Sequence, residues 1–505
     1  MARKTTRWMR AVGCGGLVLC VAGAVVRGAD QVQWGKQYSR NMVSEEKGLP
    51  TSFDPATGKN IKWVAKLGNE THGTPTIGGG RVLVGTNNGE PRDVRHKGDR
   101  GVTMCFDEKD GKFLWQLVVP KIGGDVYLDW PRGGMVSPAT IEGDRLYTVT
   151  NRDEVVCLDM KGMADGNDGP YRDEAAHQTP KGEGRIEVGA TDADVLWMCD
   201  LEKEVGIYHH DAAHSSPLLY GDYLYVNSSN GVDNTHRKIR KPDAPSLVVI
   251  DKRTGRIVAK DEEHIGPRVF HCTWSSPALG EVNGRPLVFF CGGDGVVYAF
   301  ETIKAPAEGE AAKLTKVWQF DCDPTGPKEN VHKWTGNRRE SPSNIKSMPV
   351  FDNGRLYVTV GGDIWWGKRQ GWIKCIDPSK TGDVTKSAAI WSYEMKQTCS
   401  TVAVHDGLVY AADCGGQIHC VDAATGKGLW VHKVEGEIWA SPLVADGKVY
   451  IGSCNGLFLI FAEGREKRVL SSIQLDDRIS ATAVAANGVV YVTTWSKMYA
   501  VANGK

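Results

Sequence analysis

The chain has 505 residues, of which 41% are hydrophobic and 24% are charged. This is the composition of a globular protein, with enough length for a large core. Its 61 basic and 61 acidic side chains balance, which argues against nucleic acid as a partner and against bulk electrostatic attraction to a membrane. The 60 glycines favour many short strands joined by tight turns.

The first 28 residues are predicted to be a signal peptide for export. Four positive side chains lie near the start, at Arg3, Lys4, Arg7 and Arg10. An apolar run over 11–26 follows, and this run is short for a membrane span. Cleavage is expected after Ala24 or Gly28, which leaves a mature chain without a transmembrane segment. The signal predicts a periplasmic or secreted protein, and an uncleaved anchor is the rival interpretation.

Residues 29–51 are assigned to a lead-in segment, and residues 52–505 contain a repeat of roughly forty residues. Each copy has an apolar entry strand, a glycine turn, a strand with a tyrosine-like position, a second turn and two further strands. The tyrosine-like position recurs eight times, at Leu83, Tyr147, Tyr225, Phe289, Tyr357, Tyr410, Tyr450 and Tyr491. One copy supplies one four-stranded antiparallel blade, so the sequence predicts an all-β, eight-bladed β-propeller.

The ends of the repeat array complement one another. The C-terminal copy stops after three strands, whereas residues 54–63 are the end of a copy that has no beginning. Pairing the N-terminal strand with the C-terminal blade closes the ring and removes an exposed sheet edge. We therefore expect residues 52–67 to supply the outermost strand of the last blade, and trimming just after the signal to matter little. An open solenoid is the rival architecture.

The repeat also accounts for residues that resemble a reactive site. Cys105, Cys157, Cys375 and Cys420 occupy a position where other copies carry Ala299 or Ala500, so we expect these thiols to be buried and reduced. Tryptophans end five of the fourth strands and are expected to pack between blades; they are Trp63, Trp115, Trp318, Trp391 and Trp430. Removal of the signal leaves eleven cysteines, an odd number.

The Asp–x–x–Thr–Gly–Lys–x–x–Trp element resembles the tryptophan-docking motif of the pyrroloquinoline-quinone repeat propellers. Residues 292–301 (GGDGVVYAFE), 400–430 and 440–452 look like secreted bacterial propellers of the quinoprotein alcohol dehydrogenase-like type. The resemblance covers nearly the whole mature chain. It implies the propeller fold without fixing a function, because the family includes quinone-dependent dehydrogenases and also scaffolds such as the propeller lipoprotein of the outer-membrane β-barrel assembly machinery.

Three features of the quinoprotein dehydrogenases can be sought in this chain. The adjacent pair of cysteines is missing, and residues 269–276 (VFHCTWSS) contain no carboxylate where a catalytic aspartate is expected. Only Asn230, in a Ser–Asn–Gly turn, matches the calcium-ligand asparagine. Pyrroloquinoline quinone with calcium is therefore not favoured as the cofactor, and no cofactor is assigned. The favoured function is a binding or scaffolding module; the alternative is a quinone-dependent dehydrogenase of alcohols or sugars with a degenerate site.

Propeller geometry locates a candidate ligand site. Loops that enter the first strand and loops between the second and third strands share one face. Long insertions of the second kind, 89–101, 231–245 and 363–371, are rich in cations, whereas the opposite-face insertions 162–194 and 304–313 lean acidic. A small anionic ligand or a protein partner is expected on the basic face. The rival interpretation is that these loops are merely solvated.

The residue that enters each innermost strand is expected to line the channel mouth on the basic face. Around the ring this residue is His72, Met135, His214, Trp274, Lys346, Cys399, Trp439 and Ser480. The candidate ligand- or cofactor-binding residues are His72, His214, Asn230, Trp274, Lys346 and Trp439, and a water-filled funnel is the rival interpretation. His210 and His214 flank Asp211, but on a loop this spacing is insufficient for a metal assignment. No catalytic residue is assigned.

Overall fold

The computed structural model describes residues 1, 29–123, 126–305 and 309–504. The predicted signal peptide, apart from Met1, lies outside the described residues, and so do its cleavage positions. Across the described ranges, no helix is long and apolar enough to cross a membrane.

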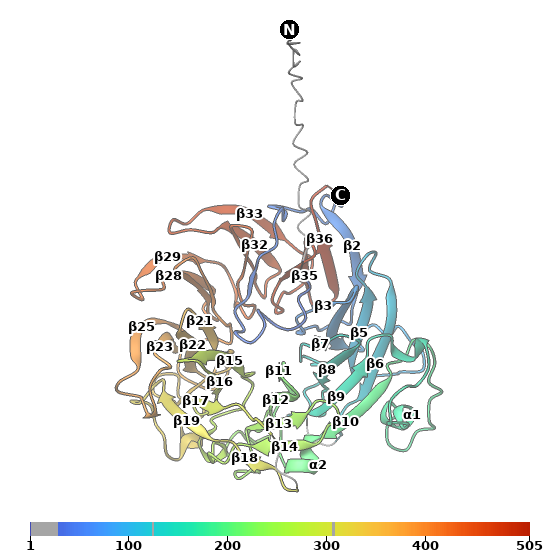
Figure 1. Cartoon of the computed structure of the whole chain (residues 1–505), viewed down its shortest axis with the longest axis horizontal. Coiled ribbons are helices and arrows are strands. Elements are labelled where there is room, and N and C mark those ends of the chain that lie inside the picture. Colours follow the sequence, from blue (N-terminus) through green and yellow to red (C-terminus); the bar gives the residue numbers. More distant parts are fainter. Residues whose placement is uncertain (2–28, 124–125, 306–308, 505) are drawn as a thin grey trace.

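The chain forms eight β-sheets arranged as blades around a central axis, which confirms the predicted all-β, eight-bladed propeller (Figure 1). The first blade comprises β3 (Thr76–Gly78), β4 (Arg81–Asn87), β5 (Arg100–Asp107) and β6 (Phe113–Pro120). The second comprises β7 (Thr140–Glu142), β8 (Arg145–Val149), β9 (Glu154–Asp159) and β10 (Val195–Asp200). The third comprises β11 (Leu218–Tyr220), β12 (Tyr223–Asn227), β13 (Leu247–Asp251), β14 (Ile257–Lys260) and the short β18 (Ala312–Lys313).

The fourth blade comprises β15 (Ala278–Val282), β16 (Arg285–Cys291), β17 (Val296–Glu301), β19 (Lys316–Asp321) and β24 (Gly382–Asp383). The fifth comprises β20 (Ser343–Asn344), β21 (Val350–Asp352), β22 (Arg355–Gly362), β23 (Gln370–Ile376) and β25 (Ala389–Lys396). The sixth comprises β26 (Ala403–His405), β27 (Leu408–Ala412), β28 (Gln417–Asp422) and β29 (Gly428–Lys433). The seventh comprises β30 (Leu443–Ala445), β31 (Lys448–Gly452), β32 (Leu457–Ala462), β33 (Val469–Gln474) and β1 (Val43–Ser44).

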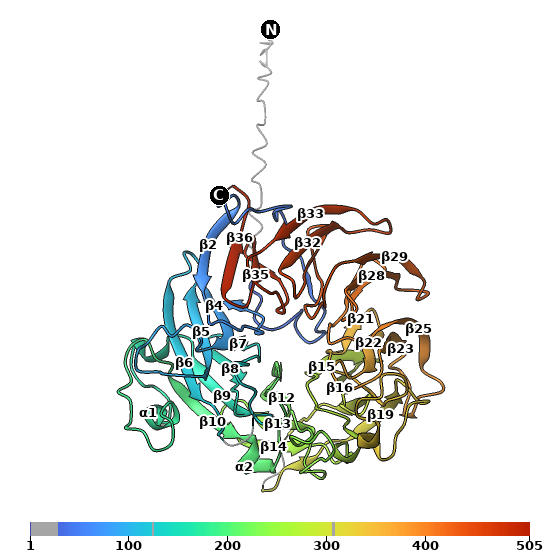
Figure 2. The same cartoon turned by 180° about the vertical axis from the view of Figure 1, so that it is seen from behind.

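The eighth blade closes the ring. It comprises β34 (Val484–Ala486), β35 (Val489–Thr493), β36 (Lys497–Val501) and, from the other end of the chain, β2 (Ile61–Lys66). β2 pairs antiparallel with β36, with Trp63 opposite Ala500, and both views show the two strands side by side (Figure 2). The predicted closure by residues 52–67 is confirmed, and the open solenoid is excluded.

Tryptophans in the fourth strands of six described blades fasten each of these blades to the next; the fourth strands of the third and seventh blades, β14 and β33, carry none. Trp63 is 8% exposed, and its indole Nε1 donates to the backbone oxygen of Glu108, 3.0 Å away in the first blade. Trp430 is equally buried and donates to the oxygen of Gly464 at 3.1 Å. Trp197 makes the same bond to Lys252 at 2.9 Å. Sequence comparison missed Trp197 because the long insertion 162–194 separates it from its repeat.

The four cysteines of the third strands are buried and free, as predicted. Cys105 lies opposite Trp115 on the neighbouring strand, and Cys420 lies opposite Trp430. Each thiol therefore fills the space beside a docking tryptophan. The cysteine position and the tryptophan position together form the apolar contact between blades.

The lead-in segment contacts all eight blades, mainly along their innermost strands. Its backbone accepts hydrogen bonds from Ile77, Ile141, Leu279, Phe351 and Val444. Its side chains reach the remaining three blades through Arg40 to Ser216, Asn41 to Val404 and Glu46 to Gly488. These contacts argue against the expectation that trimming after the signal matters little, because the segment ties the inner strands of the blades together.

The insertion 162–194 does not simply face away from the basic loops, as its opposite-face assignment implied. It contains η1 (Gly162–Ala164) and α1 (Glu174–His177), lies at the outer edge (Figure 1) and continues toward the insertion 89–101. There the Arg95 guanidinium contacts Asp192 at 3.0 Å. Some cations of the basic face are thus neutralised by this acidic insertion. The remaining helices are α2 (Leu201–Val205), η2 (Gly266–Arg268) and η3 (Val331–Trp334).

Candidate functional site

A cavity of about 460 Å³ opens on the axis, where the entry loops of the blades converge. Seven of the eight predicted entry residues line it: His72, His214, Trp274, Lys346, Cys399, Trp439 and Ser480. Met135 does not, because it is buried and its sulfur accepts from Thr103; its neighbours Gly133 and Val136 line the cavity instead. The innermost strands thus bring residues from all eight blades to one place.

Asn230 was predicted at this site but is not among the cavity-lining residues. Its Oδ1 accepts from the backbone N–H of Tyr208 at 3.1 Å, and its Nδ2 donates to the backbone oxygen of Lys241 at 3.0 Å. Both polar atoms of this fully buried side chain are thus used to join loops. Asn230 braces the site instead of facing a ligand.

Tryptophan rings form much of the cavity wall. Trp365 contacts Trp439, with ring centroids 6.0 Å apart, and Trp274, with centroids 5.8 Å apart. Asp363 positions this part of the wall, because its Oδ1 accepts from the backbone N–H groups of both Trp365 and Trp366. The two adjacent tryptophans are 36% and 37% exposed, which leaves their rings accessible at the mouth. The pair stands in the insertion 363–371, where no repeat position marks it as part of the cavity wall.

Lys346 lies under the aromatic wall and is already paired. Its Nζ is 3.1 Å from Asp363 Oδ2, 3.1 Å from Cys272 Sγ and 4.3 Å from the centroid of the Trp274 ring. Burial opposes the charge of Lys346, but Cys272 and Asp363 raise its pKa. Burial also opposes ionisation of Asp363, yet His271 and Lys346 hold its pKa below the usual range. The charge of Lys346 is therefore compensated within the protein.

The cavity rim carries a more accessible cation. Arg478 lies over the Trp495 ring, 4.6 Å from its centroid, and its Nε donates to the backbone oxygen of Cys454 at 3.1 Å. Nearby, His72 Nδ1 lies 2.9 Å from Ser480 Oγ, and its Nε2 lies 3.4 Å from Glu70. The His72 ring also stacks on Trp439. An anionic group that enters the cavity would meet Arg478 at the mouth.

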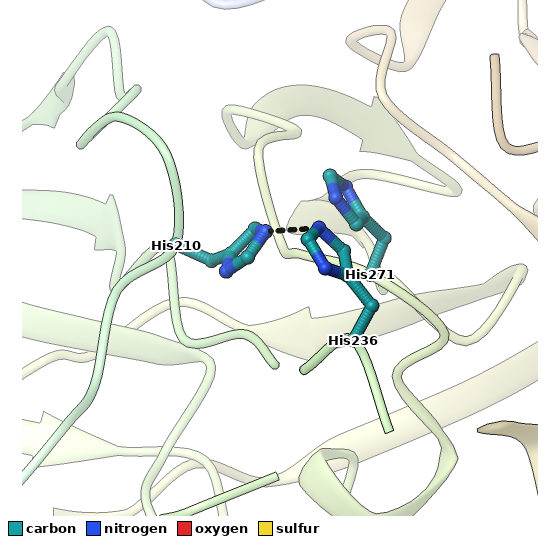
Figure 3. Close-up of side chains that lie close together, drawn as sticks. All are labelled: His210, His236 and His271. Carbon is teal, nitrogen blue, oxygen red and sulfur yellow. Dashed lines mark hydrogen bonds between the residues drawn. The ribbon is translucent and has the colours of Figure 1, made fainter. Parts of the chain in front are cut away.

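Three buried histidines, His210, His236 and His271, meet beside the cavity floor (Figure 3). Nε2 of His210 lies 3.2 Å from Nε2 of His236, and one ring nitrogen from each of the three lies within 4.8 Å of the others. Burial lowers the pKa of His210 to about 3, and it also lowers the pKa values of His236 and His271. All three rings are therefore neutral at physiological pH.

Backbone contacts explain why these histidines meet. His209 forms an isolated β-bridge with Asn230, and Gly231 forms another with Cys272. The loops that carry the three histidines are therefore joined directly through their backbones. A Cβ on Gly231 would lie 2.6 Å from His210 Cβ and 2.8 Å from the backbone oxygen of His271. Only glycine allows this close approach. The spacing of these histidines along the chain gave no signal of the cluster, because three separate loops contribute to it.

Comparisons with known proteins agree with this architecture. A repeat model described as outer membrane protein assembly factor BamB matches residues 31–121 and 369–501, less than half of the chain. The quinohemoprotein alcohol dehydrogenase ADH IIB of Pseudomonas putida is 20% identical over 454 residues, which are 84% of this chain and 59% of that enzyme. The chain therefore spans less than two thirds of the length of this curated relative.

Two solved structures were found to be similar, and one of them shares the arrangement of blades. BamB from Moraxella catarrhalis superposes with a TM-score of 0.52 at 12% identity, over 87% of this chain and 96% of BamB. A europium-containing methanol dehydrogenase gives a TM-score of 0.48 at 13% identity, over 94% and 98% of the two chains. The chain thus has the fold of the pyrroloquinoline-quinone-like β-propellers and resembles them in sequence.

The residues of this propeller do not fit the quinone–calcium group that the resemblance to quinoprotein dehydrogenases implies. The matched asparagine, Asn230, has both polar side-chain atoms engaged by loop backbone. Carboxylates do reach the region from elsewhere in the chain, namely Asp211 and Asp363. However, Asp363 is paired with Lys346, and Asp211 contacts the histidine cluster. No reaction through a bound quinone follows from these residues.

Proposed function

We propose that this chain is an exported ligand-binding propeller that takes a small aromatic anion into its axial cavity. One observation carries the proposal: seven entry-strand residues converge on a single cavity whose wall is rich in tryptophan. A cavity of about 460 Å³ matches the usual size of a small-molecule site. Tryptophan faces favour a flat, ring-shaped ligand.

The exposed cation Arg478 supports an anion placed at the rim, although the carboxylate of Glu70 also lines the cavity. Lys346 is compensated by Asp363, so it adds little net attraction in the interior. Arg478 lies at the mouth against Trp495, where its guanidinium can pair with a carboxylate or sulfonate of the ligand. The ring of such a ligand would then extend inward to Trp365 and Trp439.

Export is part of this proposal. The basic region and the apolar run of the first 28 residues are typical of a signal peptide. The family model that matches the chain describes an outer-membrane assembly factor. A scaffolding role toward a protein partner is supported only at the level of fold, through the likeness to BamB.

Fluorescence titration of the purified mature chain tests the proposed function. Naphthalene sulfonate is the probe, and uncharged naphthol is its matched neutral analogue. We expect saturable quenching of tryptophan emission by the sulfonate, with at least about tenfold weaker binding in Arg478→Gln, because a charge-assisted contact contributes about 1.5–3 kcal/mol. Arg237→Gln, an exposed cation outside the cavity, is the control. Equal affinities for sulfonate and naphthol, or no effect of Arg478→Gln, would contradict the proposal.

A second candidate is a quinone-dependent dehydrogenase, favoured by the alignment with the Pseudomonas putida enzyme over 84% of this chain. The engaged state of Asn230 argues against it. An activity assay distinguishes the dehydrogenase from the binding module: the protein is incubated with pyrroloquinoline quinone and calcium, and dye reduction is then measured with alcohols and sugars as substrates. Substrate-dependent dye reduction would favour the dehydrogenase, and its absence together with sulfonate binding would favour the binding module.

A further inference from the structure

We propose that His210, His236 and His271 form a binding site for one divalent first-row transition-metal ion, with the Asp211 carboxylate as a fourth ligand. Neutral imidazole is a common ligand of zinc, copper, nickel and iron. The site lies beside the axial cavity and does not depend on the proposed binding of an aromatic anion. Its support comes from distances, burial and missing partners.

The distances fit a metal centre. Ligands bound to zinc at about 2.0–2.1 Å in tetrahedral geometry lie about 3.3–3.4 Å from one another. Nε2 atoms of His210 and His236 are 3.2 Å apart, and Nε2 of His210 is 3.4 Å from Asp211 Oδ1. Nε2 of His271 is 3.8 Å from Asp211 Oδ2. The three histidine nitrogens lie within 4.8 Å of one another, so metal binding requires the His271 ring to move closer to the other ligands.

Buried atoms in this set lack other partners. Neither Nε2 of His271 nor Oδ1 of Asp211 has a hydrogen-bond partner, and both atoms are shielded from solvent. His271 as a whole is only 1% exposed. A buried polar atom without a partner costs about 1–3 kcal/mol. A metal ion placed among the four groups would satisfy both of these atoms at once.

Outer contacts resemble those that orient metal-bound histidines. His271 Nδ1 lies 3.4 Å from the carboxylate of Asp363 and 3.3 Å from Lys346 Nζ, so polar side chains hold this ring in place through the nitrogen that does not face the cluster. On the outer side, the rings of Trp366 and His236 have centroids 4.8 Å apart. His236, His271 and Asp211 also line the axial cavity. The metal would therefore lie in the wall of the axial cavity.

Calorimetric titration with zinc tests the site. The full mature chain is stripped of metal with a chelator, freed of chelator and titrated with zinc sulfate; cobalt replaces zinc for visible spectroscopy. We expect one equivalent to bind and to raise the melting temperature, since an ion that binds only the folded state stabilises it. His236→Gln and His210→Gln should weaken binding by at least about a hundredfold, more than the usual effect of losing an outer contact.

The control variant is His264→Gln, because His264 is an exposed histidine on the segment that joins the third and fourth blades; it should bind zinc as the wild type does. Far-UV circular dichroism confirms that each variant is folded. Cys272→Ser tests whether the neighbouring thiol is a ligand and should leave the affinity unchanged. Failure of the folded wild type to bind zinc or cobalt, or unchanged affinity in folded His236→Gln, would overturn the metal site. Sulfonate binding is measured separately, so either proposal can fail alone.

Discussion

Replacement of Trp63 by alanine tests ring closure quantitatively. Trp63 belongs to β2, the N-terminal strand that pairs with the C-terminal strand β36. Its side chain is only 8% exposed. Burial of a tryptophan removes about 200 Å² from water, worth at most about 5 kcal/mol at roughly 25 cal/mol per Å². The substitution also leaves the backbone oxygen of Glu108 without its indole donor. Trp63→Ala should therefore cost about 3–5 kcal/mol of unfolding free energy.

Trp430→Ala is a matched control, because Trp430 has the same exposure and an equivalent bond to Gly464 but lies within the array. Urea unfolding followed by far-UV circular dichroism should give similar losses for both variants. If the N-terminal strand did not close the ring, Trp63→Ala would cost less than about 1 kcal/mol while Trp430→Ala would keep its full cost. That result would refute the closed ring.

Three other predictions concern the lead-in, the outer insertion and the thiols. Arg40→Ala should destabilise the protein by about 3 kcal/mol or more in urea unfolding, because this fully buried guanidinium donates to Pro277, Trp34 and Ser216; a loss below about 1 kcal/mol would contradict the bracing role of the lead-in. Burial opposes ionisation of Glu154, but its hydrogen bond and attraction to His177 lower its pKa to about 2. Since the pKa of an unfolded glutamate is about 4.3, this carboxylate stabilises the fold above that pH, and its contribution disappears as the pH falls toward 2. Glu154→Gln should therefore cost about 3 kcal/mol near pH 6 and almost nothing near pH 2, whereas a pH-independent loss would contradict the assigned pairing. Burial raises the pKa of Cys105 to about 12, so a thiol reagent should modify the partly exposed Cys399 well before Cys105 in native protein, as mass spectrometry of digested samples would show.

Most of the fold could be predicted from the sequence because the blades repeat one pattern of strands and turns. The tyrosine-like position, the glycine turns and the docking tryptophans are local patterns, and the half-repeat ending at Trp63 implied closure. The same regularity located the channel mouth, since each entry residue has a fixed place in its blade. Met135 departs from this rule because its side chain turns away from the channel, where its sulfur accepts a hydrogen bond from the hydroxyl of Thr103 on a neighbouring strand.

The remaining features depend on contacts between loops that carry no repeat. Asn230 lies in the expected turn, yet both polar atoms of its side chain form hydrogen bonds with the backbone of Tyr208 and Lys241. The His210–His236–His271 cluster is built from three loops, and Gly231 allows these loops to approach closely. The repeat pattern of the sequence does not predict this contact. The contacts of the lead-in could not be predicted for a similar reason: its sequence has no strand pattern, but it follows the inner strands of the whole ring.

A crystal structure of the mature protein soaked with naphthalene sulfonate tests the central claim most directly. The proposed function predicts density for the ring in the axial cavity against Trp365 and Trp439, with the sulfonate beside Arg478. An empty cavity at a concentration that saturates fluorescence quenching, or density bound only elsewhere on the propeller, would contradict it.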